Sequence, residues 1–370
     1  MLRFDRRLLM NFDWVLLASV ILIAIMCLAN LYSAIYPNQP IGTPVYIKQL
    51  YFFLMGFVLI GVIISIDYKI FLTWNYFIYG MVIFMLLFAL FFGKSQAGTQ
   101  RWINLGFFNL QPSEPAKLML VIALASYYAR KDTGKGFTLK ELFIPITLTL
   151  FPFLLILKQP DLGTALMLGF IFVSITLFVK LKIQTLTILL SITGTLIPLA
   201  WKFFLKPYQR QRIETFLNPE SDPLNTGYHI MQSKIAVGSG LGFGKGYLKG
   251  TQGYLDFLPE RHTDFAFSVW AEEWGFVGSF FLLSCYCFML LWGLNIAVTS
   301  RDKFGTLLVI GIISLITWQT FINLAMVMGL LPVVGMPLPL FSYGGSSLLT
   351  TMAGIGIILS VRMRRYQKPS

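Results

Sequence analysis

Charged side chains are scarce in this sequence. Only 12% of its 370 residues are Asp, Glu, Lys or Arg, whereas 56% are hydrophobic. Soluble globular domains carry roughly twice that charged fraction. The shortage of charge, together with long uncharged runs, excludes a soluble globular chain and favours a polytopic helical membrane protein. Helices suit lipid because they satisfy their own backbone hydrogen bonds.

Cysteine and histidine are rarer still. The three cysteines, Cys27, Cys285 and Cys287, all lie inside apolar runs. That placement predicts buried free thiols and gives no support to a disulfide framework. The two histidines, His229 and His262, have no further His or Cys near them at zinc-ligand spacing, so we expect no histidine-based metal site.

A nucleotide-binding loop is also missing. The glycine-rich segment 238–246 contains neither the G-x-G-x-x-G spacing nor a complete P-loop pattern. We therefore interpret it as a flexible turn and expect no organic cofactor.

Ten apolar runs are long enough to be membrane helices. They cover residues 14–35, 47–66, 74–92, 113–130, 142–157, 162–180, 183–204, 265–294, 305–329 and 345–361. We therefore predict an all-α, polytopic membrane protein with about ten transmembrane helices. Residues 1–370 would form a single domain, with a long extracytoplasmic loop over 205–264 between helices seven and eight.

Basic residues indicate the orientation in the membrane. With the N-terminus inside, sixteen of the 29 Lys and Arg residues fall in inner segments, and the short outer loops hold few. Both termini are therefore expected to be cytoplasmic. Nucleic-acid binding is not expected, because the positive charge is dispersed along the chain instead of forming one basic face.

The densest group of ionisable side chains comes just before the eighth apolar run. It contains Asp256, Glu260, Arg261, His262 and Asp264. Such a cluster beside a membrane is a candidate for chemistry, and a charged helix cap is the alternative interpretation. One carboxylate among scattered cations suits proton abstraction from a hydroxyl and stabilisation of an anionic leaving group.

Two further polar groups lie at predicted outer helix ends. Glu114 and Lys117 are three residues apart on one helical face, and Ser113 before them is a predicted N-cap. They would form either a structural ion pair or, with Arg101, a site for an anionic group.

Lys158 and Asp161 flank Pro160, where the chain would break between two helices and either line a cavity or form a plain polar turn. Arg210 and Arg212 alternate with other polar residues after an aromatic, which suits recognition of a phosphate or sugar.

Every ionisable residue that we place inside a helix or at its lip is on the outer side. This asymmetry favours a cavity open to the outside over a pathway through the membrane, because transporters typically place such groups near the midplane. We expect Glu272 and Glu273 to line the cavity roughly 12 Å below Asp264.

Taken together, these motifs resemble the SEDS family (shape, elongation, division and sporulation), and within it the rod-elongation branch. One departure is Pro115, where the family has an aromatic residue. The matching segments are 100–103, 111–114, 159–164, 232–236, 258–265 and 339–347.

The resemblance implies a ten-helix glycosyltransferase that polymerises lipid II at the outer face of the bacterial cytoplasmic membrane, with inversion at the anomeric carbon. Its partners would be a class B penicillin-binding protein transpeptidase and other elongation-complex membrane proteins. The family's essential aspartate matches Asp264, which would activate the acceptor hydroxyl directly or through a divalent cation such as Mg²⁺ or Mn²⁺. A lipid II flippase and a recruiting scaffold are the rival hypotheses.

Under this interpretation a set of polar residues near the outer face would bind the substrate. They are Arg101, Glu114, Lys117, Lys158, Asp161, Arg210, Arg212, Gln232, Lys234, Glu260, Arg261, His262, Ser342 and Ser346.

Overall fold

The computed structural model describes most of the chain. The described residues are 11–36, 43–96, 99–104, 106, 109–131, 134, 136–204, 207–218, 222, 226–254, 257–258 and 260–366. Asp256 of the predicted ionisable cluster, the first ten residues and residues 367–370, with the basic side chains they carry, lie outside these ranges.

Ten helices correspond one for one to the predicted apolar runs, which confirms the all-α polytopic fold. Seven of them are long and apolar enough to cross a membrane; α7 and α8 are shorter, and α5 carries charged residues. The ten are α2 (Trp14–Ile35), α3 (Val45–Ser65), α4 (Lys69–Phe92), α5 (Ser113–Arg130), α6 (Leu139–Lys158), α7 (Leu162–Phe178), α8 (Ile183–Leu199), α12 (Ala266–Val298), α13 (Lys303–Val327) and α14 (Gly345–Met363).

Shorter elements connect these helices at one end of the bundle. A small antiparallel sheet, in the order β1-β2-β3, precedes α5, and its short polar strands gave no alternating pattern in the sequence. The connecting elements are β1 (Lys94–Gln96), β2 (Thr99–Asn104), β3 (Asn109–Leu110), the π-helix η1 (Ala200–Phe204), α9 (Pro207–Leu217), α10 (Thr226–Ser239) and α11 (Thr251–Tyr254).

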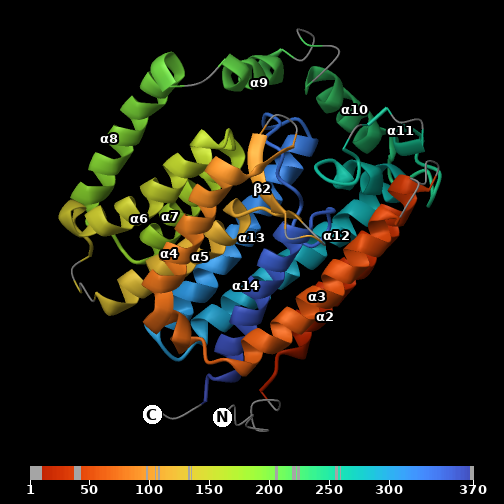
Figure 1. The fold of residues 1–370 in the computed structure, drawn as a ribbon. Coiled ribbons are helices and arrows are strands. Elements are labelled where there is room, and N and C mark those ends of the chain that lie inside the picture. The colour runs from red at the N-terminus through yellow and green to blue at the C-terminus, as the bar shows by residue number, and fades with distance from the viewer. Residues whose placement is uncertain are drawn as a thin grey trace.

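Helices α13 and α14 form the centre of the bundle, and α8 stands apart from it (Figure 1). The apolar windows of α13 and α14 are 72% and 78% buried, against 28% for α4. Small residues allow the close packing: a Cβ at Gly311 of α13 would lie 2.5 Å from Val121 of α5. The core therefore holds the central helices rigidly where the site is built.

Helix α12 is broken at Gly275, whose φ of 62° and ψ of −157° are not helical. The backbone groups freed by the break pair with segment 240–246. Phe276 N–H donates to the Leu241 carbonyl at 2.8 Å, and Lys245 N–H donates to the Glu272 carbonyl at 3.0 Å. The predicted turn in this segment is confirmed, but its expected flexibility is not, because its backbone is hydrogen-bonded to α12 at the break.

The two glutamates before the break do not line a cavity below Asp264, contrary to our expectation. The Glu272 carboxylate is fully buried and accepts hydrogen bonds from Lys245 Nζ at 2.6 Å and from Thr251. Glu273 accepts a hydrogen bond from the Ser33 hydroxyl of α2. The first turns of α12 thus direct Glu273 toward α2 and Glu272 toward residues 245–252.

Two local predictions were also wrong. Pro112, not Ser113, is the N-cap of α5; Ser113 is its first residue, and its hydroxyl is buried with no hydrogen-bond partner among the described residues. Cys27 and Cys285 are buried free thiols as predicted, but Cys287 is exposed. The helix break around Pro160 is confirmed, since α6 ends at Lys158 and α7 begins at Leu162.

Removing the Lys245 ammonium should destabilise the fold because it leaves the buried Glu272 carboxylate without its cation. We expect Lys245→Met to lower the free energy of unfolding by about 2 kcal/mol. Lys249→Met is the matched control, since Lys249 is exposed on the same segment, and should change it by less than about 0.5 kcal/mol. Unfolding in detergent measures both; equal losses would contradict the role given to the Lys245–Glu272 pair.

Candidate functional site

A polar cavity of about 250 Å³ lies where the first turns of α5, α7 and α14 meet the turn before α12 and the loop after α13. Its walls come from six separated parts of the chain. They are Trp102, Gln111, Glu114, Thr164, Glu260, Thr263, Asp264, Gly335, Met336, Pro337, Tyr343, Gly344, Gly345, Ser346 and Ser347.

Asp264 lies two residues before α12, partly buried in the wall of this cavity. Its carboxylate faces Gly335, where a Cβ would lie 3.5 Å from Asp264 Oδ2, an ordinary van der Waals contact. Gly335 also has a φ of +70°, a conformation that favours glycine. The glycine therefore provides the backbone conformation that the loop adopts beside the carboxylate.

Burial raises the pKa of Asp264 to about 6. The nearby Glu260 carboxylate raises the pKa further by repulsion, whereas the Arg212 guanidinium lowers it. At neutral pH the Asp264 side chain is thus largely ionised, yet it is a stronger base than an ordinary aspartate. This is the property that a general base for a hydroxyl group needs.

Two amide side chains of α13 hold the walls of the cavity together. The buried Asn323 donates from Nδ2 to the carbonyls of Asp264 at 2.9 Å and Met336 at 2.7 Å. One turn earlier, Gln319 donates from Nε2 to the Pro337 carbonyl at 3.1 Å and to Ser347 Oγ at 3.1 Å. The turn carrying Asp264, the proline-rich loop after α13 (residues 328–344) and α14 are therefore fixed to one central helix.

Glu114 and Lys117 form the predicted pair, with Lys117 Nζ 2.9 Å from Glu114 Oε1. Both side chains are buried, and Lys117 also donates to Gln319 Oε1 at 3.2 Å. Glu114 lines the cavity, whereas Lys117 does not and lies behind it. The pair thus connects α5 to the amide pair on α13.

The Arg101 side chain is hydrogen-bonded to the turn between α6 and α7. Its guanidinium donates to the carbonyls of Gln159, at 2.8 Å, and Pro160, and its Nη1 lies 3.5 Å from Asp161 Oδ2. Asp161 in turn caps α7 by accepting from Thr164 N–H at 3.1 Å. The structure therefore brings Arg101 and Asp161 together beside the cavity and uses both to hold its rim.

The predicted cations on the long connection between α8 and α12 (residues 205–264) do not line the cavity. Arg210 donates to the Lys202 carbonyl at 3.0 Å, and Arg212 Nη1 donates to the Val333 carbonyl at 3.2 Å. Three other residues predicted to bind the substrate lie on two further helices: Lys158 is exposed at the end of α6, and Gln232 and Lys234 lie on α10.

The remaining candidates surround Asp264. Glu260 lines the cavity, and Arg261, the next residue in the sequence, is buried. Burial lowers the pKa of His262, and the Glu260 charge opposes that shift, so His262 is mainly neutral at pH 7. Its carbonyl accepts from Tyr343 N–H at 2.8 Å, which joins the turn to the start of α14.

Two serines hold backbone near the cavity. Ser342 Oγ accepts from Leu338 N–H at 3.0 Å, inside the proline-rich loop. Ser346, which lines the cavity, accepts from Gln111 N–H at 3.1 Å.

Three carboxylates line the cavity, and since Glu114 is paired with Lys117, those of Asp264 and Glu260 are the ones that could hold a divalent cation. The described residues contain no group of three His, Cys, Asp or Glu side chains that could enclose a metal ion. Asp264 and Glu260 nevertheless suit Mg²⁺, which is usually bound by one or two carboxylates together with substrate phosphates.

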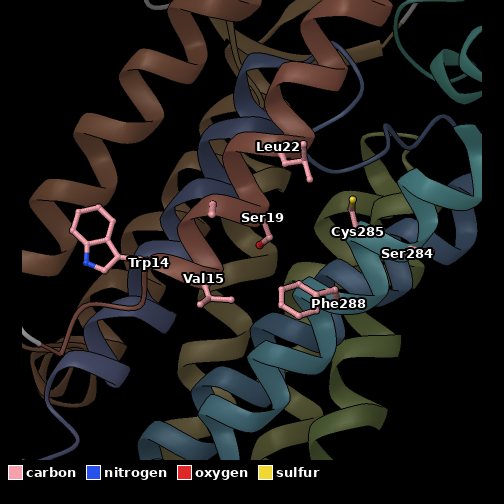
Figure 2. A pocket seen from close by; sticks show the side chains of 8 residues that line it. Trp14, Val15, Ser19, Leu22, Ser284, Cys285 and Phe288 are labelled. Carbon is pink, nitrogen blue, oxygen red and sulfur yellow. The ribbon is translucent and has the colours of Figure 1, made fainter.

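A larger hollow of about 520 Å³ lies between α2 and α12, away from these groups. Figure 2 shows Val15, Ser19 and Leu22 facing Cys285 and Phe288 across it. Its lining is almost wholly apolar and contains no charged side chain, so it offers nothing for acid–base chemistry.

Comparison with known proteins identifies the family. A family model described as a cell cycle protein, covering FtsW, RodA and SpoVE, matches residues 8–367. The chain belongs to this family. The match confirms the SEDS resemblance, and it accounts for almost the entire sequence.

Individual members of the FtsW/RodA/SpoVE family agree along most of the chain. The peptidoglycan glycosyltransferase MrdB of Escherichia coli K12 is 42% identical over 84% of both chains. A chain from a peptidoglycan synthase complex that coordinates polymerization and crosslinking has a TM-score of 0.83 at 33% identity, covering 96% of this chain and 99% of that one. The crystal structure of Thermus thermophilus RodA has a TM-score of 0.71 at 30% identity, covering 96% and 98%.

Sequence reasoning missed Gln319 and Asn323. The signal that marks them is simple: they are amides four residues apart, on one face of an otherwise apolar helix. Buried amides in a membrane helix are expected to have hydrogen-bond partners, and here those partners are the walls of the site.

Replacing Asn323 by leucine should leave the carbonyls of Asp264 and Met336 unpaired in a buried place. We expect Asn323→Leu to lower the free energy of unfolding by about 2 kcal/mol. Thr320→Val is a matched control on the same helix, because the buried Thr320 hydroxyl has no hydrogen-bond partner among the described residues. A loss for Thr320→Val as large as that for Asn323→Leu would argue against a specific role of the amide.

Proposed function

We propose that this protein is a peptidoglycan glycosyltransferase that polymerises lipid II into glycan strands during cell elongation. The observation that carries the proposal is Asp264, a carboxylate of raised basicity in the wall of a polar cavity. The names of the relatives support the same chemistry, since MrdB is called a peptidoglycan glycosyltransferase.

In the proposed reaction Asp264 accepts the proton of the acceptor sugar hydroxyl. The hydroxyl oxygen then forms a bond to the anomeric carbon of the donor, and the bond from that carbon to the diphosphate oxygen breaks. Because one base and one displacement suffice, the configuration at the anomeric carbon inverts and no covalent enzyme intermediate is needed.

The diphosphate that leaves needs positive charge. Arg212 is the best candidate among the predicted cations, because its charge acts on Asp264 and its side chain is exposed. Lys158 and Lys234 are exposed as well and remain candidates for diphosphate binding. We assign Arg101 and Lys117 to the support of the cavity wall, since their polar atoms already have partners.

A divalent cation held by Asp264 and Glu260 would supply additional charge neutralisation for the diphosphate. If Asp264 held that ion, it would activate the hydroxyl through the cation instead of taking the proton directly, whereas the role of α13 in holding its backbone would be unchanged.

We further propose that both termini are cytoplasmic and that the cavity opens on the outer face of the membrane. The distribution of Lys and Arg supports this orientation. A class B penicillin-binding protein is the proposed partner, supported by the similar chain found in a complex that couples polymerization to crosslinking. Other membrane proteins of the elongation complex are expected to join it.

Polymer formation from purified lipid II tests the proposal. Asp264→Asn keeps the shape of the side chain but removes the base, so we expect the initial rate to fall by at least about 100-fold. Glu214→Gln makes the same chemical change on an exposed residue of α9 and should leave the rate unchanged. Unaltered polymerisation by Asp264→Asn would overturn the mechanism, and scrambling of lipid II without polymer would favour a flippase.

The pH dependence of the rate should follow the Asp264 carboxyl group. Since the base must be deprotonated and its pKa is raised to about 6, kcat/KM should rise with pH through a midpoint at about pH 6 and level off well above that midpoint. Glu260→Gln removes a like charge and should move the midpoint to lower pH. Arg212→Gln removes an opposite charge and should move it higher. Identical midpoints in all three proteins would contradict the assignment.

A further inference from the structure

Segment 240–246, between α10 and α11, carries two large apolar side chains that nothing in the described chain covers. Leu241 is 80% exposed and Phe243 is 87% exposed. Figure 1 shows α10 and α11 beside the upper part of α12, on the side of the bundle opposite α8. In water, such side chains on a polar connection would be an uncovered apolar patch.

These side chains cannot withdraw by a simple movement of the segment. The Leu241 and Gly242 carbonyls accept from the N–H groups of Phe276 and Val277 at 2.8 and 3.0 Å. A Cβ at Gly244 would lie 2.1 Å from the Glu273 carbonyl oxygen, so the two backbones are in direct contact. The segment is therefore fixed to α12 at its break, with its apolar side chains directed outward.

Positions along α2 measure depth in the membrane, because α12 contacts α2 at its N-cap and the residue next to segment 240–246 contacts it near its other end. Trp292 of α12 donates to Asp13 at the N-cap of α2, and Tyr247, next to the segment, donates to the Ala29 carbonyl at 3.1 Å. At 1.5 Å per residue, Ala29 lies roughly 9 Å before the end of α2 at Ile35. A hydrocarbon layer of about 30 Å measured from Trp14 extends beyond Ala29.

The surface beside the segment faces lipid on independent grounds. Phe276 and Phe280, the first exposed aromatics after the break, belong to the apolar span of α12 and are 69% and 62% exposed. Leu241 and Phe243 continue this surface, because the backbone of residues 241–242 is bonded to that of Phe276 and Val277. Lys245, the cation within the segment, points to the buried Glu272 and is paired with it, and the exposed Lys249 lies three residues beyond the segment.

We propose that segment 240–246 is immersed in the membrane leaflet on the cavity's side, with Leu241 and Phe243 lying among lipid acyl chains. Three observations converge on lipid as the occupant: the depth along α2, the continuity with the exposed face of α12, and the neutralised charge of Lys245. The segment would thereby anchor the long connection, including α10, to the bilayer. This inference does not depend on the reaction that the protein catalyses.

Depth-dependent fluorescence quenching in lipid nanodiscs tests the proposal with the full chain. Single cysteines replace Phe243 or, as a second site, Leu241 in a protein whose own cysteines are changed to alanine, and each is labelled with an environment-sensitive dye. Phe280→Cys on α12 provides the acyl-chain reference. Asn104→Cys, exposed at the end of β2, provides the water reference.

We expect the dye at Phe243→Cys and at Leu241→Cys to emit at the shorter wavelengths found for Phe280→Cys. Nitroxides on lipid acyl chains should quench it strongly and aqueous iodide weakly. Emission and iodide quenching equal to those of Asn104→Cys would overturn the proposal and indicate a surface left free for a protein partner. Elution of each labelled variant as a monodisperse peak confirms that the comparison is made on folded protein.

Discussion

The arrangement of the site depends on hydrogen bonds from two amides on one buried helix. Asn323 holds the carbonyl of Asp264 and that of the loop across from it, and Gln319 holds the same loop, α14 and the Lys117–Glu114 pair. Because α13 is largely enclosed by its neighbours, with 72% of its apolar window buried, it cannot easily shift. A carboxylate that must meet a substrate within a few tenths of an ångström gains a rigid reference from that helix.

Around this centre, the basic side chains of Arg101 and Lys117 bond to the walls of the cavity and do not line it. Arg101 bonds to the turn before α7, and Lys117 is paired behind Glu114. That leaves the cavity with carboxylates, hydroxyls and amides, an environment in which Asp264 retains its proton to higher pH than in water. The positive charge that a diphosphate requires would then come from the exposed cations of the long connection.

Much of the fold could be predicted from the sequence, because lipid imposes strong rules on helix length and hydropathy. The ten helices appear within a few residues of the expected runs, and Asp264 does lie in a polar cavity. What could not be predicted follows from tertiary contacts. Glu272 bonds to Lys245 and Thr251 instead of lining the cavity, and the break at Gly275 binds segment 240–246; no local pattern in the sequence distinguishes this glycine from others.

The central claim is that this cavity brings a substrate hydroxyl to Asp264, and a structure with bound substrate tests it most directly. The Asp264→Asn variant in lipid nanodiscs, saturated with lipid II, would hold the reactants without turnover. We predict a sugar hydroxyl oxygen about 2.6–3.2 Å from the side chain at position 264, with Asn323 still bonded to that residue's carbonyl. Sugars bound elsewhere, with the cavity empty, would contradict the account.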